Sequence, residues 1–193
     1  MAKVKTTVGV TAGIFNGEGK LLLRRRTEHD SITGIDYAGN WELPVVAVQE
    51  TEKESIRYDY LSLELVRGVE AETGFKIILN EPMPAFYPVM FKGPQGYDLA
   101  MITVIVSWFV PQVELKAVTK FVSLDELNQL AREFISLTDA KKQGLPEAKG
   151  LLSGFGKRQH CLALKALSIA PVGEEIKRVR AKETLIEIQK NWS

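Results

Sequence analysis

The chain has 193 residues, of which 45% are apolar and 25% charged, and its formal net charge is +1. This composition is that of a globular protein, and the charge balance excludes a global field that would attract nucleic acid or an anionic membrane. A single cysteine, Cys161, excludes an internal disulfide and a cysteine-based zinc cluster. No apolar run is long enough to span a bilayer, and the N-terminus lacks the apolar core of a signal peptide, so we expect a cytoplasmic protein.

Two strands joined by a tight turn are predicted at the start of the chain. They cover Thr6–Phe15 and Lys20–Arg26, and the Asn16-Gly17 pair between them is a strong hairpin signal because both residues tolerate positive φ. The second strand ends in three arginines, Arg24, Arg25 and Arg26. Two interpretations of these arginines stay open. Alternate side chains could point to solvent from the end of the strand, or the run could be a patch that binds phosphate or nucleic acid.

A polar loop, Thr27–Asn40, follows the arginines and is rich in Gly, Asp and Ser. The segment Trp41-Glu42-Leu43-Pro44 then leads into the apolar run Val45–Val48. After this run, a turn that spans Gln49–Ser55 carries three acids. These acids precede the longest helix predicted in the first half of the chain, and they favour its positive end.

This helix is expected from about Ser55 to Thr73, with Ser55 as its N-cap. Gly74 closes the helix, because glycine just past a helix end takes the left-handed conformation at no steric cost. The apolar run Phe75–Leu79 then predicts a buried strand. The helix end, the glycine and the strand should therefore form one rigid unit.

The remainder of the chain predicts a hairpin and then helices. The runs Val89–Lys92 and Leu99–Val110 flank a Gly/Pro-bearing turn, and the second run is apolar enough for a central strand. A helix beginning after Ser123 has Glu126 at the capping-box spacing. Two more helices are expected at Arg158–Ile169 and Glu174–Trp192, and the apolar residues of the last one could pack on the domain or on a second subunit.

The stretch Leu65–Phe75 resembles the second half of a Nudix box, whose family pattern is G-x5-E-x7-R-E-U-x-E-E-x-G-U, where U is a bulky apolar residue. Arg67, Glu72 and Gly74 match its arginine, its last glutamate and its glycine. The tryptophan-x-leucine-proline segment at Trp41 is also similar to the lead into that box.

The segment Phe121–Leu127 is similar to another Nudix feature, an apolar residue followed by a serine-leucine-acid-glutamate-leucine helix start. The resemblance covers roughly Val4–Phe134. It implies an α/β (α+β) fold in which a mixed, curved sheet is packed between helices. We expect a Nudix-like domain over 1–140 and a helical C-terminal extension over 141–193 that packs on the same domain.

Three residues depart from the family pattern. Gly68 stands where the glutamate after the arginine belongs, and Ala71 stands where the first glutamate of the pair belongs. Val46 replaces the glycine that opens the pattern. Neither Gly68 nor Ala71 offers a side-chain oxygen, so the resemblance implies a degenerate box whose standard metal cluster has lost most of its negative charge.

If the chain is active, the resemblance implies Mg²⁺ or Mn²⁺ bound by carboxylates near the helix end. The expected metal ligands are Glu72, Glu64 and Glu52, and the expected catalytic residues are Glu72, Arg67 and Glu54. The alignment of the first acid stays open between Glu52 and Glu54. Arg67 is chiefly a support for the glutamates and should pair with Glu72 or Glu64.

The expected ligand-binding residues are Arg24, Arg26, Trp41 and Glu42. Trp41 could stack on a base or lie buried behind the Leu43-Pro44 turn. The cleft is expected between the Thr27–Asn40 loop, Trp41, the acidic turn and Glu72.

Two functions remain open. One is a protein that binds a nucleoside-diphosphate-like or other phosphorylated small molecule, with metal-dependent hydrolysis lost or impaired. The other is an atypical Nudix hydrolase that cleaves a nucleoside diphosphate linked to another moiety, using Mg²⁺ held by Glu72 and substitute acids. The expected partners are a nucleotide-like ligand and a second copy in a homodimer, and neither nucleic acid nor a membrane is expected.

Overall fold

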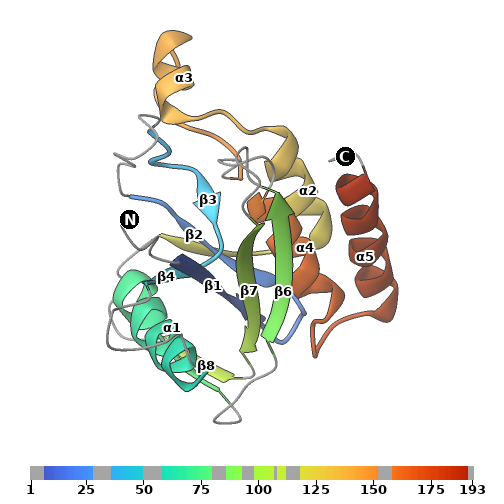
Figure 1. Cartoon of the computed structure of the whole chain (residues 1–193). Helices are drawn as coiled ribbons and strands as arrows, with labels where there is room; N and C mark the ends of the chain where they lie inside the picture. The colour runs from blue at the N-terminus through green and yellow to red at the C-terminus, as the bar shows by residue number, and fades with distance from the viewer. Residues whose placement is uncertain are drawn as a thin grey trace.

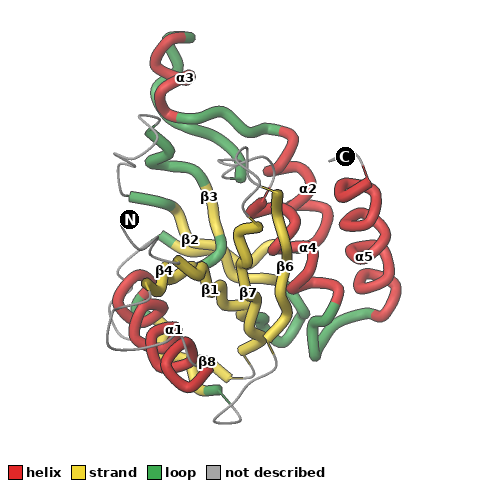
Figure 2. Tube along the Cα trace, in the orientation of Figure 1, coloured by secondary structure: helices red, strands yellow, loops and turns green. Residues whose placement is uncertain are grey.

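The computed structural model describes residues 7–27, 36–49, 58–79, 86–92, 98–106, 108–111, 118–151 and 158–190. The strands lie in the middle, with α1 (Tyr58–Thr73) on one side and α4 (Arg158–Ser168) on the other (Figure 1). Figure 2 shows the same layers by element type. The predicted α/β (α+β) fold, a mixed sheet packed between helices, is thereby confirmed.

The larger sheet has the strand order β4-β1-β7-β6. Strand β1 (Thr7–Ile14) runs antiparallel to β4 (Val45–Gln49) and parallel to β7 (Asp98–Val106). Strand β6 (Phe86–Lys92) pairs antiparallel with β7, as the hairpin prediction requires. β7 has a strand on each side, which agrees with the central place predicted from its continuous apolar sequence.

Two smaller sheets complete the strand layer. Strand β2 (Leu21–Arg25) pairs antiparallel with both β3 (Trp41–Glu42) and β9 (Thr119–Val122). Strand β5 (Phe75–Ile78) pairs antiparallel with β8 (Trp108–Pro111).

Two strands are described within the predicted single strand Leu99–Val110, and Ser107 between them lies outside the described residues. β7 ends at Val106, β8 begins at Trp108, and each pairs with different neighbours. An apolar run fits both strands equally well, so the sequence pattern does not reveal a change of pairing partner.

The predicted hairpin of β1 and β2 is confined to its turn: Phe15 and Leu21 form one isolated antiparallel bridge, whereas β1 and β2 pair with other strands in different sheets. The Asn16 Oδ1 atom accepts hydrogen bonds from the N–H groups of Glu18 and Lys20, at 3.1 and 2.9 Å. Gly19 has φ 74°, whereas Gly17 is not among the positive-φ glycines. Asn16 therefore holds the turn with its side chain, and the left-handed position falls two residues after the one that the Asn-Gly signal indicated.

Alternation along β2 separates two hydrophobic clusters, one on each face of the strand layer. Leu21 and Leu23 belong to the cluster that contains Leu162 and Leu164 of α4. Leu22 belongs to the cluster on the α1 side, together with Leu61, Leu65 and Val69. Side chains of the same parity as Leu22 therefore face α1, which places Arg24 on that side.

The C-terminal third supplies the second helical layer. The helix α2 (Leu124–Arg132) begins with the predicted capping box, in which the Ser123 N–H donates to Glu126 Oε2 at 2.7 Å and the Glu126 N–H donates to Ser123 Oγ at 3.3 Å. The short helix α3 (Leu137–Lys142) projects at one end of the molecule (Figure 1). The buried side of α4 forms part of the cluster around Leu21, and Ala181 and Leu185 of α5 (Glu175–Lys190) join it.

The predicted helix boundaries agree with the structure where it describes the chain. α4 and α5 lie within the predicted ranges, and α1 ends at Thr73 as expected. The predicted N-cap Ser55 and the last residues of the predicted final helix lie outside the described residues. Among the helices of the described part, none is long and apolar enough to cross a bilayer.

Candidate functional site

Four charged side chains meet at the end of β2 that faces α1. We call this group the Arg24 cluster; it consists of Arg24, Arg26, Glu42 and Glu72. The strand pairing itself brings two of them together, because Arg24 lies opposite Glu42 in the β2–β3 register. Three of the four expected ligand-binding residues therefore lie beside Glu72, the residue expected to bind metal.

The core of the Arg24 cluster is a buried ion pair. Nη2 of Arg24 lies 2.7 Å from Oε1 of Glu42, and the two side chains are 5% and 1% exposed. Arg26 Nη1 donates to Glu42 Oε2 at 3.3 Å. A buried carboxylate is costly unless cations and donors compensate for its lost hydration, and the two arginines supply that compensation. Arg24 does not point to solvent, so the solvent-facing interpretation of the arginine run was wrong for this residue.

Glu72 enters the cluster from the last turn of α1. Its Oε2 lies 3.2 Å from Nε of Arg24, and its side chain is 22% exposed. Arg24 thus carries one carboxylate on Nη2 and another on Nε, and it links β3 to the end of α1. Glu72 is the only member of the cluster on a helix, and it keeps more exposure than Arg24 or Glu42.

The local structure at the end of α1 fixes the place of Glu72. Gly74 has φ 78°, and its N–H donates to the carbonyl oxygen of Glu70 at 3.0 Å. The Thr73 hydroxyl donates to the carbonyl oxygen of Val69 at 2.6 Å and accepts from the Phe75 N–H at 3.0 Å. The left-handed cap predicted for Gly74 is therefore present, and Thr73 ties the helix end to β5.

Arg67 and Glu64 lie outside the Arg24 cluster. Arg67 Nη1 donates to Glu64 Oε1 at 3.4 Å, and the Arg67 side chain is largely exposed. Of the two pairings expected for Arg67, the structure contains the one with Glu64. An exposed pair three residues apart on one helix contributes little to stability.

Gly68 and Val46 lie against each other where α1 packs on β4. A β-carbon built on Gly68 would overlap the Cγ2 atom of Val46 and would also crowd its Cβ and Cγ1. Two of the three departures from the family pattern are therefore in direct contact. The valine at the position of the opening glycine fills the volume that a side chain at position 68 would need.

Trp41 lies on the other face of the strand layer. It is half-buried against the cluster that contains Leu21 and Leu43, and Lys120 Nζ lies 4.2 Å above the centroid of its ring. Burial removes part of the hydration of the Lys120 ammonium group and so lowers its pKa below the usual lysine value. The face of the Trp41 ring compensates in part for the lost water. The structure does not bring Trp41 together with Glu42, because neighbouring residues of β3 point to opposite faces.

Asn40 is a buried residue beside the expected cleft, and nothing in its sequence neighbourhood indicates its role. Its Nδ2 donates to the carbonyl oxygens of Lys149, at 2.6 Å, and Ile135, at 3.1 Å. Arg25 also holds this region, through Glu147 at 2.6 Å. These bonds join segments more than 90 positions apart, and no local pattern in the sequence indicates such a contact.

The described residues do not by themselves form a metal site. Among them, no group of three or more His, Cys, Asp or Glu side chains could hold a metal ion. Glu72 lies against Arg24, Glu64 lies against Arg67, and Gly68 between them has no side chain. The other expected acids, Glu52 and Glu54, lie outside the described residues.

No family model and no curated protein matches this chain. Among solved structures, the chain is similar to the E. coli ORF135 protein, at 22% identity and a TM-score of 0.44 over 66% of this chain and 81% of that one. It is also similar to the MutT protein from Methanosarcina mazei Go1, at 27% identity and a TM-score of 0.44 over 64% and 81%.

A third similar structure covers more of the chain. It is the Nudix hydrolase RenU from M. smegmatis, at 16% identity and a TM-score of 0.40 over 86% of this chain and 88% of that one. This likeness says nothing of activity or substrate.

Proposed function

We propose that this Nudix-like protein binds a nucleoside-diphosphate-like or other phosphorylated small molecule, and that its standard metal-dependent hydrolysis is lost or impaired. The observation that carries this proposal is the contact between Val46 and Gly68. The side chain of Val46 fills the volume that the β-carbon of a glutamate at position 68 would occupy. A helix with this packing lacks one of the oxygen ligands that a hydrated magnesium ion needs.

The surroundings of Glu72 support the same proposal. Its carboxylate faces the guanidinium of Arg24, so a fixed positive charge already stands beside the glutamate expected to bind metal. A divalent cation at that carboxylate would be repelled by the buried arginine at short range, where screening by solvent is weak. The protein thus supplies from its own chain a cation that takes the place of a metal beside Glu72.

Arg26 supports the binding part of the proposal. It lies at the edge of the Arg24 cluster, and its side chain is 19% exposed, against 5% for that of Arg24. Guanidinium groups bind phosphate oxygens through paired N–H donors, and they do so more strongly where water is partly excluded. A phosphate group at this edge would contact Arg26 first. Glu42, which is itself paired with Arg24, would fix the position of the Arg26 side chain.

The alternative expected from the sequence is an atypical hydrolase for a nucleoside diphosphate linked to another moiety. It would use Mg²⁺ or Mn²⁺ at Glu72, Glu64 and Glu52, with Arg67 and Glu54 in supporting or catalytic roles. The partial exposure of Glu72 is compatible with this alternative. A cytoplasmic location is also a proposal, and the single cysteine, which is free and buried, is compatible with it.

One experiment separates the two functions. Binding is measured by calorimetry with ADP-ribose, nucleotide sugars, dinucleoside polyphosphates and nucleoside triphosphates, first in EDTA and then in millimolar magnesium or manganese. Product formation is followed in the same samples. The variants are Arg26→Gln and Glu72→Gln, and the control is Arg132→Gln, an exposed arginine on α2.

We expect binding in EDTA that weakens at least about tenfold in Arg26→Gln, is kept in Arg132→Gln, and is accompanied by no or very slow turnover. Robust turnover that requires metal and disappears in Glu72→Gln would overturn the proposal and establish the atypical hydrolase. If no member of the panel binds, with or without metal, the binding proposal is wrong.

A further inference from the structure

The outer side of α5 carries an apolar stripe that the monomer leaves exposed. Ile176, Val179 and Ile186 are all exposed, Ile176 to 61%. Together with Glu183 and Lys190, they follow the spacing of three and four residues that keeps side chains on one face of a helix. We call this set the outer stripe; Figure 1 shows α5 at the edge of the molecule, beyond α4.

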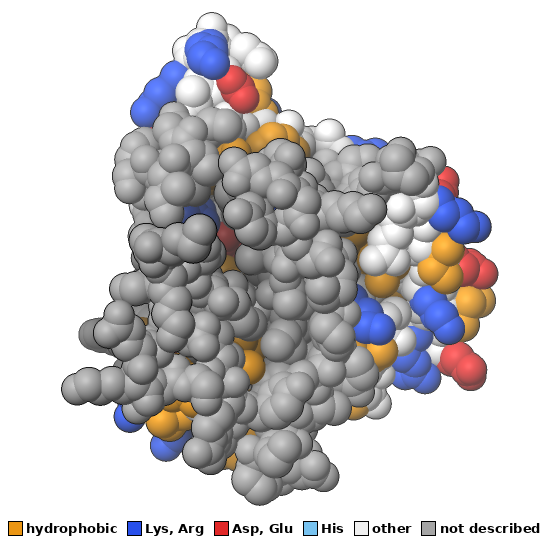
Figure 3. Space-filling view, in the orientation of Figure 1, with side chains coloured by type: hydrophobic (Ala, Val, Ile, Leu, Met, Phe, Trp, Pro, Cys, Tyr) orange, Lys and Arg blue, Asp and Glu red, His pale blue; other side chains and the backbone are white. Residues whose placement is uncertain are grey.

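The opposite side of α5 packs against the hydrophobic core. Ala181 and Leu185 are buried in the hydrophobic cluster shared with α4. On a helix with 3.6 residues per turn, these two residues lie about 180° and about 140° from the centre of the outer stripe. The stripe is therefore not the core-facing side of an amphipathic helix. Figure 3 shows hydrophobic side chains among charged ones along this edge of the molecule.

We propose that the outer stripe is a self-association surface on which α5 of a second copy packs antiparallel. In an isologous pair centred at the level of residue 181, Ile176 lies opposite Ile186 of the second copy, and Val179 lies opposite Glu183 of the second copy. The two-fold axis repeats both contacts, so each apolar residue of the stripe gains a neighbour.

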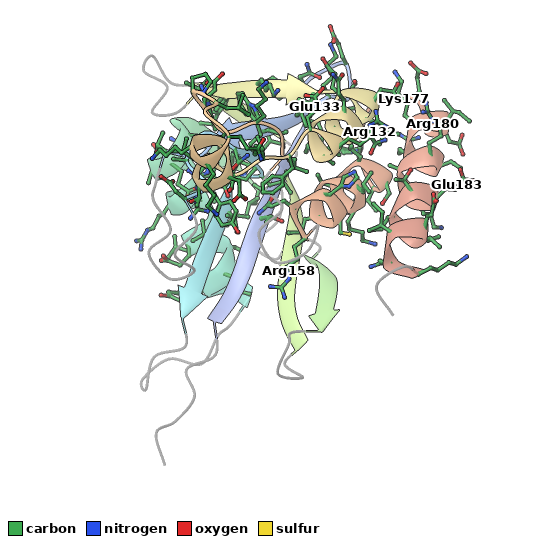
Figure 4. All side chains as sticks on the ribbon, turned by 90° about the horizontal axis from the view of Figure 1, so that it is seen from above. Arg132, Glu133, Arg158, Lys177, Arg180 and Glu183 are labelled. Carbon is green, nitrogen blue, oxygen red and sulfur yellow. The ribbon has the colours of Figure 1, made fainter. Side chains whose placement is uncertain are left out.

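The charges on α5 select the antiparallel direction. In a parallel pair, Glu183 would meet Glu183 of the second copy at the centre of the seam, and like charges in contact are unfavourable. In the antiparallel pair, Glu183 lies at almost the same height as Arg180 of the second copy, on the same side of the seam. Figure 4 shows Arg180 and Glu183 projecting from α5.

Arg180 is available for this contact. It donates to Asp125 of α2 at 3.0 Å, and the two side chains are 52% and 73% exposed. Such an exposed pair is weak, and the five donors of a guanidinium can serve a second carboxylate at the same time. The contact with Asp125 also holds Arg180 near the edge of the stripe, which lowers the entropy that it loses on association.

The proposed dimer is weak, because two single helices bury less than the roughly 800 Å² per partner of a standard interface. We expect a dissociation constant on the order of 100 μM, measured by analytical ultracentrifugation over a range of concentrations. Ile176→Glu should raise it at least about tenfold. The control is Leu63→Glu on α1, where the leucine is 47% exposed, and it should leave the dissociation constant unchanged.

A mixing experiment tests the direction of the pair. Arg180→Glu and Glu183→Arg should each abolish self-association, because each places like charges opposite one another across the seam. Mixed in equal amounts, the two variants should associate at least as tightly as the natural chain, since every facing pair is then of opposite sign. An ion pair between Arg180 and Glu183 of the same helix could not explain association that appears only when the two variants are mixed.

Some outcomes would overturn the proposal. A monomer at all concentrations would do so, and so would self-association that Ile176→Glu leaves intact or that Leu63→Glu abolishes equally. A mixture of the two charge variants that stays monomeric would refute the antiparallel pair. Circular dichroism and thermal melting check that each variant is folded; the Ile176 side chain is mostly in solvent, so its substitution should leave the fold intact.

Discussion

The side chain of Val46 fills the space directly beside the Cα atom of Gly68, where any larger residue would place its β-carbon. Val46 projects from β4 onto α1 at the point where the helix backbone carries no side chain. In the family pattern the glycine stands at the first position and the glutamate at the second, so here the large and the small residue have changed places. This exchange keeps the helix against the sheet and removes a carboxylate from its surface.

The contact between Val46 and Gly68 predicts that Gly68→Ala changes the free energy of unfolding in opposite directions in the natural chain and in a Val46→Ala background. In the natural chain, Gly68→Ala should destabilise the fold by about 1–3 kcal/mol, because overlap with Val46 outweighs the better helix propensity of alanine. In a Val46→Ala background, the same substitution should stabilise the fold by about 0.5–1 kcal/mol. Urea unfolding measures all four chains. An equal effect in both backgrounds would show that Val46 does not fill the space at position 68.

Arg24 and Arg67 provide a matched pair of arginine substitutions. Arg24→Met leaves Glu42 buried with one cation fewer, so we expect a loss of about 3–5 kcal/mol of unfolding free energy. Arg67→Met removes only an exposed contact with Glu64 and should cost about 1 kcal/mol or less. Chemical denaturation of both variants is the measurement. Similar losses in the two variants would contradict a buried role for Arg24.

Gly74 and Gly17 provide a matched pair of glycine substitutions. Gly74 has φ 78°, so Gly74→Ala should cost about 1–2 kcal/mol. At Gly17 an added β-carbon meets nothing within 4 Å, and φ is not in the left-handed region, so Gly17→Ala should change stability by about 0.5 kcal/mol or less. Thermal melting compares the two. An unchanged melting temperature for Gly74→Ala would refute the left-handed cap.

The capping box of α2 predicts a pH-dependent contribution from Glu126. Hydrogen bonds from the backbone and side chain of Ser123 hold the pKa of the Glu126 carboxyl below its usual value of 4.5. A depressed folded-state pKa stabilises the fold above the unfolded pKa, and this contribution is lost as the pH falls through the folded pKa.

Glu126→Ala should therefore destabilise the protein at pH 7, by about 0.5–1 kcal/mol, and the difference from the natural chain should shrink below about pH 4. The control is Glu187→Ala, an exposed residue of α5, which should give a smaller difference. Urea unfolding at several pH values checks this. A difference that stays constant down to pH 3 would rule out the carboxylate as the stabilising form.

The sequence alone determined the features that depend on residues close together in the chain. Gly74 as a helix cap, Ser123 with Glu126 as a capping box, and the ranges of α4 and α5 were all predicted, because these signals act over three or four residues. The family resemblance extended this to the Nudix-like fold. It also indicated Arg24, Arg26, Glu42 and Glu72 as site residues, without indicating that they touch.

Only the tertiary structure decided how these residues are used. Arg24, Glu42 and Glu72 come from β2, β3 and α1, and their ion pairs depend on the register of β2 with β3 and on how α1 packs. Trp41 and Glu42 are neighbours in the chain but face opposite sides of the sheet. Val46 excludes a side chain at position 68 although 21 residues separate them. Burial and close packing are set by contacts between distant segments, and a local sequence pattern contains no distances.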